Sequence, residues 1–282
     1  MKKLITLSLA AISFIASNSY AAGTLADSEK AYKAGNYAAA ISISNPLALK
    51  GDAKAQTFLA WMYHSGKGVT QDYAEAIKWY KLAAEQGNVV AQSNLAGYYY
   101  NGTGVNQDHT EAFKWFKLAA EQNDAFSQNW LGVMYFNGQG VAQDYAEAIR
   151  WFKLAVGQGE AYAQYNLGNK YCFGKGVVQD YAEAIRLYKL SAAQGNASAQ
   201  SNLGVMYDLG QGVVQDYVAA HMWYNLAAAQ GDKTAEVNRD LVAKKMTKEQ
   251  VSQAQKLAQD CLASNYKNCL IAATQSKKKT KK

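Results

Sequence analysis

The stretch Ala163-Gln164-Tyr165-Asn166-Leu167-Gly168 carries a pattern that decides the fold, because the pattern returns along the chain at a fixed interval. It is followed by a Gly-x-Gly triplet and then by Gln179-Asp180. The Gln-Asp pair occurs five times, always 36 residues apart, at positions 71–72, 107–108, 143–144, 179–180 and 215–216. An interval without insertions over five occurrences indicates one structural unit repeated in tandem.

Each unit predicts two helices. In the first unit Leu59 and Tyr63 lie four residues apart, on one face of a helix over 53–65. The Gly-x-Gly triplet ends this helix, because glycine reaches positive φ without a steric penalty. Asp72 is a good N-cap, and Glu75 three residues later suits a capping box, so a second helix begins there.

A single helix pair cannot bury its apolar faces, so neighbouring pairs must stack. We therefore predict an all-α fold, an α/α superhelical solenoid with five repeats at 53–88, 89–124, 125–160, 161–196 and 197–232. Capping helices are expected over 22–52 and 233–274, before a disordered Lys-rich tail at 275–282.

Two local features mark these flanks. Pro46, the one proline of the chain, is expected to break or kink its helix near Asn45. Thr247 and Gln250 form a capping-box pattern that opens a last helix to about Ala263.

The repeated residues resemble the Sel-1-like repeat family, a relative of the tetratricopeptide repeat. The resemblance covers residues 53–232 and is carried most completely by Ala163–Gly168 and Ala199–Gly204. It implies an α/α superhelix and a role in protein–protein interaction. Exported bacterial proteins of this type are often linked to envelope functions or to interaction with a host.

The N-terminus predicts export. Lys2 and Lys3 precede an apolar run that is too short to span a bilayer, and Ser19 and Ala21 form a small-x-Ala cleavage site. We expect residues 1–21 to be a cleaved signal peptide and the protein to be periplasmic or secreted. No transmembrane segment is expected in the rest of the chain.

The formal net charge of +7 does not indicate a nucleic-acid surface. Two lysines of the signal peptide and five of the tail account for the excess, and 22 basic and 22 acidic residues remain. No nucleic-acid partner is therefore expected. Contact of the Lys tail with an anionic membrane surface stays an alternative.

The repeats offer no convergent catalytic cluster, so we expect no enzyme, no cofactor and no metal site. The tryptophans at 79, 115, 151 and 223 follow the repeat, which favours packing over sugar binding. An envelope enzyme, or a protein binding cell-wall glycan (peptidoglycan) or penicillin, remains the alternative function. Relatives reported to bind penicillin carry paired cysteines in each repeat, and this chain lacks them.

Cys261 and Cys269 lie eight residues apart at the end of the last helix, and in an oxidising compartment they are expected to form a disulfide. Two free thiols are the alternative. Cys172 is left over and is expected to be a partly buried free thiol, with an intermolecular role as the alternative.

Positions that vary between repeats are released from holding the fold, and on the first helix they form one stripe. In tetratricopeptide-type stacks the first helix lines the concave groove, where aromatic rings and amides suit an extended peptide. The candidate partner-binding residues are Phe58, Trp61, Asn94, Phe126, Trp130, Tyr162, Asn166, Asn169 and Asn202. Core packing of the aromatic residues and a structural role for the recurring asparagines stay open. The leading hypothesis is an exported scaffold that binds a protein or peptide partner.

Overall fold

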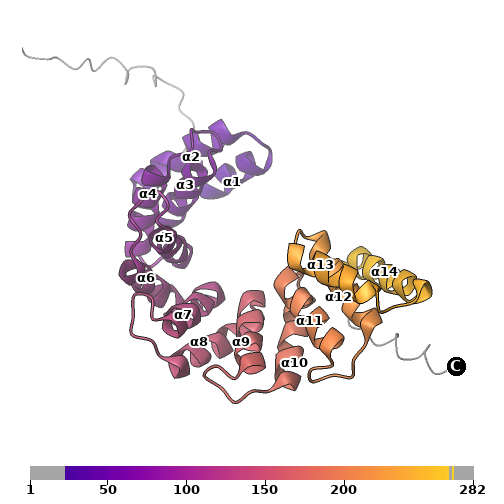
Figure 1. Ribbon diagram of the computed structural model, residues 1–282. Coiled ribbons are helices and arrows are strands. Elements are labelled where there is room, and N and C mark those ends of the chain that lie inside the picture. Colours follow the sequence, from indigo (N-terminus) through magenta and orange to yellow (C-terminus); the bar gives the residue numbers. More distant parts are fainter. Residues whose placement is uncertain (1–22, 267–268, 270–282) are drawn as a thin grey trace, which may run out of the picture. The chain divides into compact units, whose positions relative to one another are not determined.

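The computed structural model describes residues 23–266 and 269, and every regular element within them is a helix (Figure 1). Fourteen helices occur in this part of the chain. The five repeats consist of the pairs α3 (Ala53–Ser65) and α4 (Tyr73–Glu85), α5 (Val89–Asn101) and α6 (His109–Glu121), α7 (Ala125–Asn137) and α8 (Tyr145–Gly157), α9 (Ala161–Phe173) and α10 (Tyr181–Ala192), and α11 (Ala197–Leu209) and α12 (Tyr217–Ala229).

The chain forms two compact units, and the boundary between Ala91 and Gln92 falls inside α5. In the first unit, α1 (Leu25–Lys33) and α2 (Tyr37–Leu49) precede the first repeat. In the second unit, α13 (Lys233–Ala243) and α14 (Lys248–Ala263) follow the last repeat. The predicted signal peptide and Lys tail lie outside the described residues.

Aspartate caps begin the second helices, as the sequence predicts. The side chain of Asp180, for example, accepts a hydrogen bond from the backbone N–H of Glu183 at 3.0 Å. The capping box also predicts a hydrogen bond from the N-cap backbone N–H to the glutamate side chain, and this prediction is wrong at these helices. Glu183 instead forms an ion pair with Arg186 one turn further on, and Glu75, Glu111 and Glu147 pair in the same way with the basic residue three positions later. The helix starting after Thr247 does have the reciprocal capping box with Gln250.

The two glycines of each triplet have different tasks. The first one ends the helix in the left-handed region, with φ of 68° at Gly138. The second one allows close approach of the preceding repeat: a methyl group on Gly140 would overlap the carbonyl oxygen of His109. The connection is then fixed by the Gln of the Gln-Asp pair, since Gln143 Nε2 donates to the carbonyl of Phe136 at 2.8 Å.

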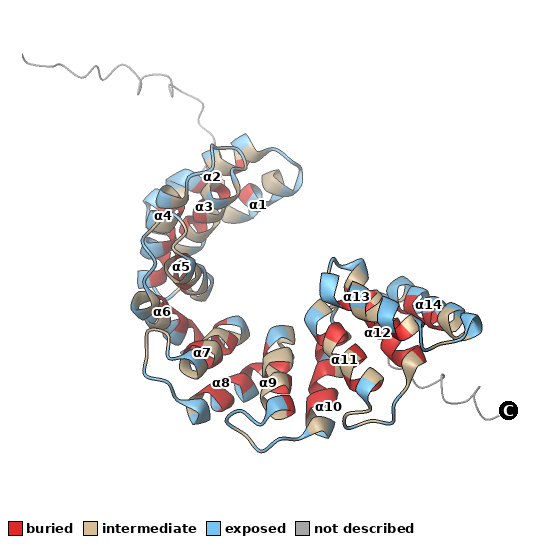
Figure 2. Cartoon of the chain, viewed as in Figure 1, coloured by how far each residue is buried: buried red, intermediate tan, exposed pale blue. Residues whose placement is uncertain are grey.

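Aromatic rings of the second helices pack on small residues of the first helices. A Cβ added at Gly168 would lie 2.8 Å from the Tyr188 ring, and one at Gly204 would lie 2.5 Å from the Tyr224 ring. Both rings are fully or almost fully buried. Figure 2 shows the buried residues concentrated where the paired helices of the second unit face each other. Of the recurring tryptophans, Trp115, Trp151 and Trp223 are buried and Trp79 is half-buried, in agreement with the packing interpretation.

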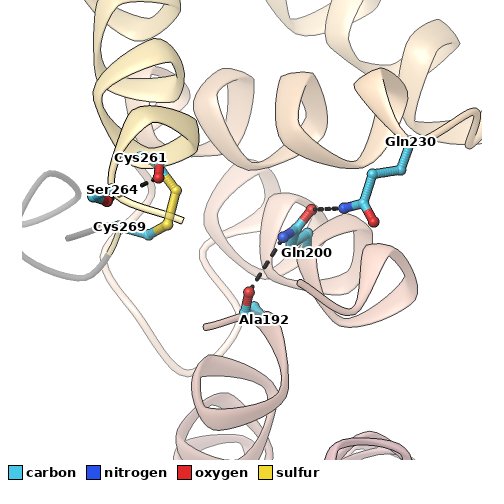
Figure 3. The surroundings of a disulfide bond; sticks show 6 residues. All are labelled: Ala192, Gln200, Gln230, Cys261, Ser264 and Cys269. Carbon is cyan, nitrogen blue, oxygen red and sulfur yellow. Dashed lines mark hydrogen bonds between the residues drawn. A yellow bond between two sulfur atoms is a disulfide. The ribbon is translucent and has the colours of Figure 1, made fainter. Parts of the chain in front are cut away.

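Paired glutamines tie the two helices of every repeat together. Gln230 Nε2, just after α12, donates to Gln200 Oε1 on α11 at 2.9 Å, and Gln200 Nε2 donates to the carbonyl of Ala192 in the preceding repeat (Figure 3). The equivalent side-chain pairs are Gln86–Gln56, Gln122–Gln92, Gln158–Gln128 and Gln194–Gln164, at 2.7–3.0 Å. The recurrence of these glutamines in sequence therefore reflects a buried polar contact that fixes the stacking.

Of the two outcomes expected for Pro46, a break or a kink near Asn45, the break is wrong, because α2 continues through this residue to Leu49. Pro46 lies in the last turn of the helix. Only one intrahelical hydrogen bond lacks its N–H donor there, and the carbonyl of Pro46 still accepts from Lys50.

The last helix covers the end of the second unit. It packs against α12 and buries Leu257, Ala258 and Cys261 in one hydrophobic cluster with Trp223. Cys261 and Cys269 are joined by a disulfide at its end (Figure 3). No helix among the described residues has the length and hydrophobicity that a bilayer span requires.

Candidate partner-binding face

The first helices of the second unit form a continuous face, which we call the first-helix face. It consists of the side chains that α5, α7, α9 and α11 carry at positions varying between repeats. Contacts between successive first helices hold it together: Tyr100 with Trp130, Asn166 with Asn129, and Asn202 with Asn169. In Figure 1 these helices follow one another along one side of this unit.

The N-terminal part of the first-helix face is aromatic. Trp130 stacks on Phe116 with ring centroids 5.7 Å apart and contacts Tyr100 at 4.6 Å. Phe126 adds an edge contact to Trp130 and is itself 47% exposed. Trp130 is half-buried. The cluster is thus anchored in the fold on one side and offers apolar area to solvent on the other.

The C-terminal part is polar, and its asparagines pair across the repeats. Asn166 Nδ2 donates to Asn129 Oδ1 at 2.9 Å, and Asn202 Nδ2 donates to Asn169 Oδ1 at 3.0 Å. Asn169 Oδ1 also accepts from the buried hydroxyl of Tyr188 at 2.6 Å. These amides therefore help to hold the stack, and the half-buried Asn166, Asn169 and Asn202 still reach solvent.

Other candidates differ in their surroundings. Tyr162 on α9 is 62% exposed, the highest fraction among the candidate aromatic residues, and Asn94 on α5 is exposed as well. In the first unit, Phe58 and Trp61 pack edge-on against Tyr32 of α1, and the ammonium of Lys67 donates to the Tyr32 hydroxyl at 2.6 Å. Those two residues are half-buried and mainly dock the N-terminal helices onto the first repeat.

Lys170 on α9 is a residue of this face that the sequence analysis missed. Its Nζ lies 3.2 Å from the centroid of the Phe136 ring on α7. Burial and, to a smaller extent, the charge of Lys175 lower its pKa to about 8. The signal was present in the repeat pattern, because the equivalent positions hold Met62, Tyr98, Met134 and Met206.

His109, His221 and Cys172 lie in packed surroundings outside this face. His109 contacts Tyr100 with ring centroids 5.0 Å apart, and Tyr145 contacts Phe136 at 4.9 Å in the next repeat, so His109 occupies a tyrosine position. His221 is buried, and this burial lowers its pKa. Burial raises the pKa of the Cys172 thiol, which is free. No group of His, Cys, Asp or Glu residues suited to a metal ion occurs in the described residues.

The second helices expose leucines at one repeated position. Leu118, Leu154 and Leu190 of the second unit and the equivalent Leu82 of the first unit are 39–46% exposed, whereas the equivalent Leu226 is fully buried in the C-terminal cluster. These leucines lie on the second helix of each pair, so they serve as exposed control positions for tests of the first-helix face.

Comparison with known proteins agrees with this architecture. A structure of a Sel1 repeat protein from Oxalobacter formigenes is 33% identical, with a TM-score of 0.71, and the match covers 75% of this chain and 84% of that one. The protective antigen c5321 of uropathogenic Escherichia coli, described as having an SLR fold, is 33% identical with a TM-score of 0.70. That match covers 84% of this chain but only 53% of the antigen, so the present chain spans about half its length.

A more distant likeness is to the immunity protein Pa5087 of Pseudomonas aeruginosa, at 20% identity and a TM-score of 0.50 over 72% of this chain and 81% of that one. It shows the fold alone. Comparison with curated protein sequences gives no match. The family model of the Sel1 repeat matches residues 53–88, 89–124, 125–160, 161–196 and 197–232. The resemblance of the sequence is thereby confirmed, and the chain belongs to the Sel1 repeat family.

Proposed function

We propose that this protein is an exported, non-enzymatic scaffold that binds a protein or peptide partner through the first-helix face. Sel1 repeats are typical of protein–protein interaction, which supports the general class. The observation that carries the specific proposal is the exposure of Phe126 and Tyr162 on first helices. Large aromatic side chains at positions that the repeat leaves free are what a partner surface needs.

The chemistry of this face favours a peptide segment over a flat protein surface. Rings supply apolar contact area, and the paired amide of Asn166 keeps one N–H and its oxygen for bonds to a backbone. An extended segment exposes backbone N–H and C=O groups along its whole length.

Photocrosslinking in living bacteria tests the proposal. A benzophenone-bearing phenylalanine replaces Tyr162 on α9 in one variant and Leu154 on α8 in the control. Both positions are exposed, so both probes can reach a bound protein. We expect a discrete crosslinked product from position 162 and none from position 154. Products from position 154 alone, or from neither position, would contradict the proposed face.

Export is a separate part of the proposal and rests on the N-terminal sequence. Sequencing the N-terminus of the protein purified from its natural host should return a chain that begins near Ala22. A chain that still begins with Met1 would overturn it.

A further inference from the structure

The five repeats allow each residue of the first-helix face to be compared with its equivalents in the same chain. At the position of Lys170 the other four repeats carry uncharged methionine or tyrosine side chains that are at most 6% exposed. Three of the four are methionine. Lys170 therefore places a cation where the other repeats place a buried, uncharged side chain.

The charge of Lys170 is poorly compensated within the chain. The ring of Phe136 attracts the ammonium, but the charge of Lys175, which lowers the pKa of Lys170, has the same sign. No carboxylate among the described residues forms an ion pair with Lys170. A half-buried ammonium without an anion is unfavourable for the folded protein, which makes a bound anion favourable at this place.

Hydrogen-bonding groups for an anion lie on the same two helices. Asn166 is one turn before Lys170 on α9 and bonds to Asn129 on α7, while Lys170 contacts Phe136 two turns further along α7. The seam between α7 and α9 therefore has an amide pair at one end and the cation at the other. An ammonium together with amide N–H donors matches the acceptor oxygens of a carboxylate.

We infer that Lys170 anchors a carboxylate of the partner, so that the partner segment over the α7–α9 seam is acidic. This inference rests on the proposed function and specifies the chemistry of the partner. The aromatic cluster around Trp130 lies on the neighbouring seam between α5 and α7. A partner segment that fits both seams has an apolar part over α5 and α7 and an acidic part over α7 and α9.

Selection from a phage-displayed library of random linear dodecapeptides tests the inference, with the purified wild-type chain, Lys170→Met and Lys175→Gln as baits. Methionine at 170 is the residue of three sibling repeats, and glutamine at 175 is the residue found at 139 and 211, so both variants suit the fold. Far-ultraviolet circular dichroism checks that both remain folded. Lys175→Gln removes an equal charge from the adjacent loop and is the matched control.

The best wild-type binder is then synthesised with an amidated C-terminus and, separately, with each Asp or Glu replaced by its amide. These forms distinguish a terminal carboxylate from a side-chain one. We expect one neutralisation to weaken binding to the wild type and to Lys175→Gln about tenfold or more and to leave binding to Lys170→Met unchanged.

Three results would be contrary. If the neutralisation weakens binding to Lys170→Met as much as to the wild type, Lys170 does not bind the carboxylate. The proposed peptide binding is then still supported. If the neutralisation also leaves binding to Lys175→Gln unchanged, the net positive charge of this region attracts the peptide, and Lys170 is not a specific anchor. If no library peptide binds the wild type, the proposed function itself fails and the inference fails with it.

Discussion

Asn166 and Leu167 are neighbours in α9 with different tasks. Leu167 is 3% exposed in the core, whereas Asn166 is half-buried on the first-helix face and bonds to Asn129. We expect Leu167→Ala to lower the free energy of unfolding by about 2–5 kcal/mol, through lost burial and the cavity left behind. Asn166→Ala should cost about 0.5–1.5 kcal/mol, the net value of one hydrogen bond. Urea denaturation of both variants measures this, and equal losses would show that the amide is as structural as the leucine.

Alanine substitutions at two glycines with positive φ distinguish the cost of backbone strain from the cost of a steric clash. Gly140 and Gly159 have φ of 70° and 82°, but a methyl group at Gly159 meets nothing within 4 Å, whereas one at Gly140 meets the His109 backbone. Alanine at either position costs about 1–2 kcal/mol for the left-handed conformation. Gly140→Ala should cost clearly more, because the contact between repeats must open. Thermal midpoints of the two variants decide this, and similar values would contradict the close approach.

The lowered pKa of Lys170 predicts a pH dependence of stability. Below pH 8 the amine is protonated in both the folded and the unfolded chain, so its burial penalty is present in full. Between about pH 8 and 10.5 the folded chain releases this proton while the unfolded chain retains it, and the folded state gains stability as pH rises. The stability difference between Lys170→Met and the wild type should therefore shrink across this window. A difference that stays constant with pH would contradict the buried position of the amine.

At the scale of single residues, the sequence predicts the roles of residues that recur at the repeat interval. It does not predict contacts between residues at non-equivalent positions of two repeats. The core leucines and the turn glycines were identifiable because they recur at one interval. The contact of Asn166 with Asn129 joins residues 37 apart, so neither partner stands at the other's equivalent position. Lys170 was identifiable only as a departure from methionine, and its burial required the structure.

At the scale of elements, the end of α14 is joined to Cys269 by a disulfide that closes a short loop. Such a bond contributes about 2–3 kcal/mol in the loop-entropy model. We expect the intact mass of the non-reduced protein to be about two hydrogens below that of the reduced chain, and Cys261→Ser with Cys269→Ser to lower the thermal midpoint. Reaction of all three thiols with an alkylating probe in denaturant without reductant would show that the bond is absent.

Element boundaries followed from local chemistry wherever one interaction dominated. The aspartate caps and the left-handed glycines gave the starts and ends of the repeat helices. Two expectations were wrong, and each for its own reason. The glutamates of the first turn form an ion pair with a basic side chain one turn later instead of bonding to the N-cap backbone, as Glu183 does with Arg186. Pro46 falls so near a helix end that little hydrogen bonding is lost.

At the scale of the whole molecule, periodicity alone predicted the stacked helix pairs, because a unit that cannot bury its own apolar faces must pack on a copy. The same periodicity contains no information about the partner, since binding depends on the residues that depart from it. Phe126, Tyr162 and Lys170 are such departures on the first helices. The exposed leucines of the second helices, by contrast, follow the repeat.

We propose that the residues that depart from the repeat, and not its recurring exposed residues, bind the partner. Calorimetry tests this by measuring the affinity of the crosslinked partner, once isolated, for two pairs of variants. Phe126→Ala and Tyr162→Ala remove exposed side chains of the first-helix face, and Leu154→Ala and Leu190→Ala remove similarly exposed side chains of the second helices. We predict that each variant of the first pair weakens binding about tenfold or more and that the second pair leaves it unchanged. Weakening confined to the leucine variants would contradict the claim and place the partner on the second helices.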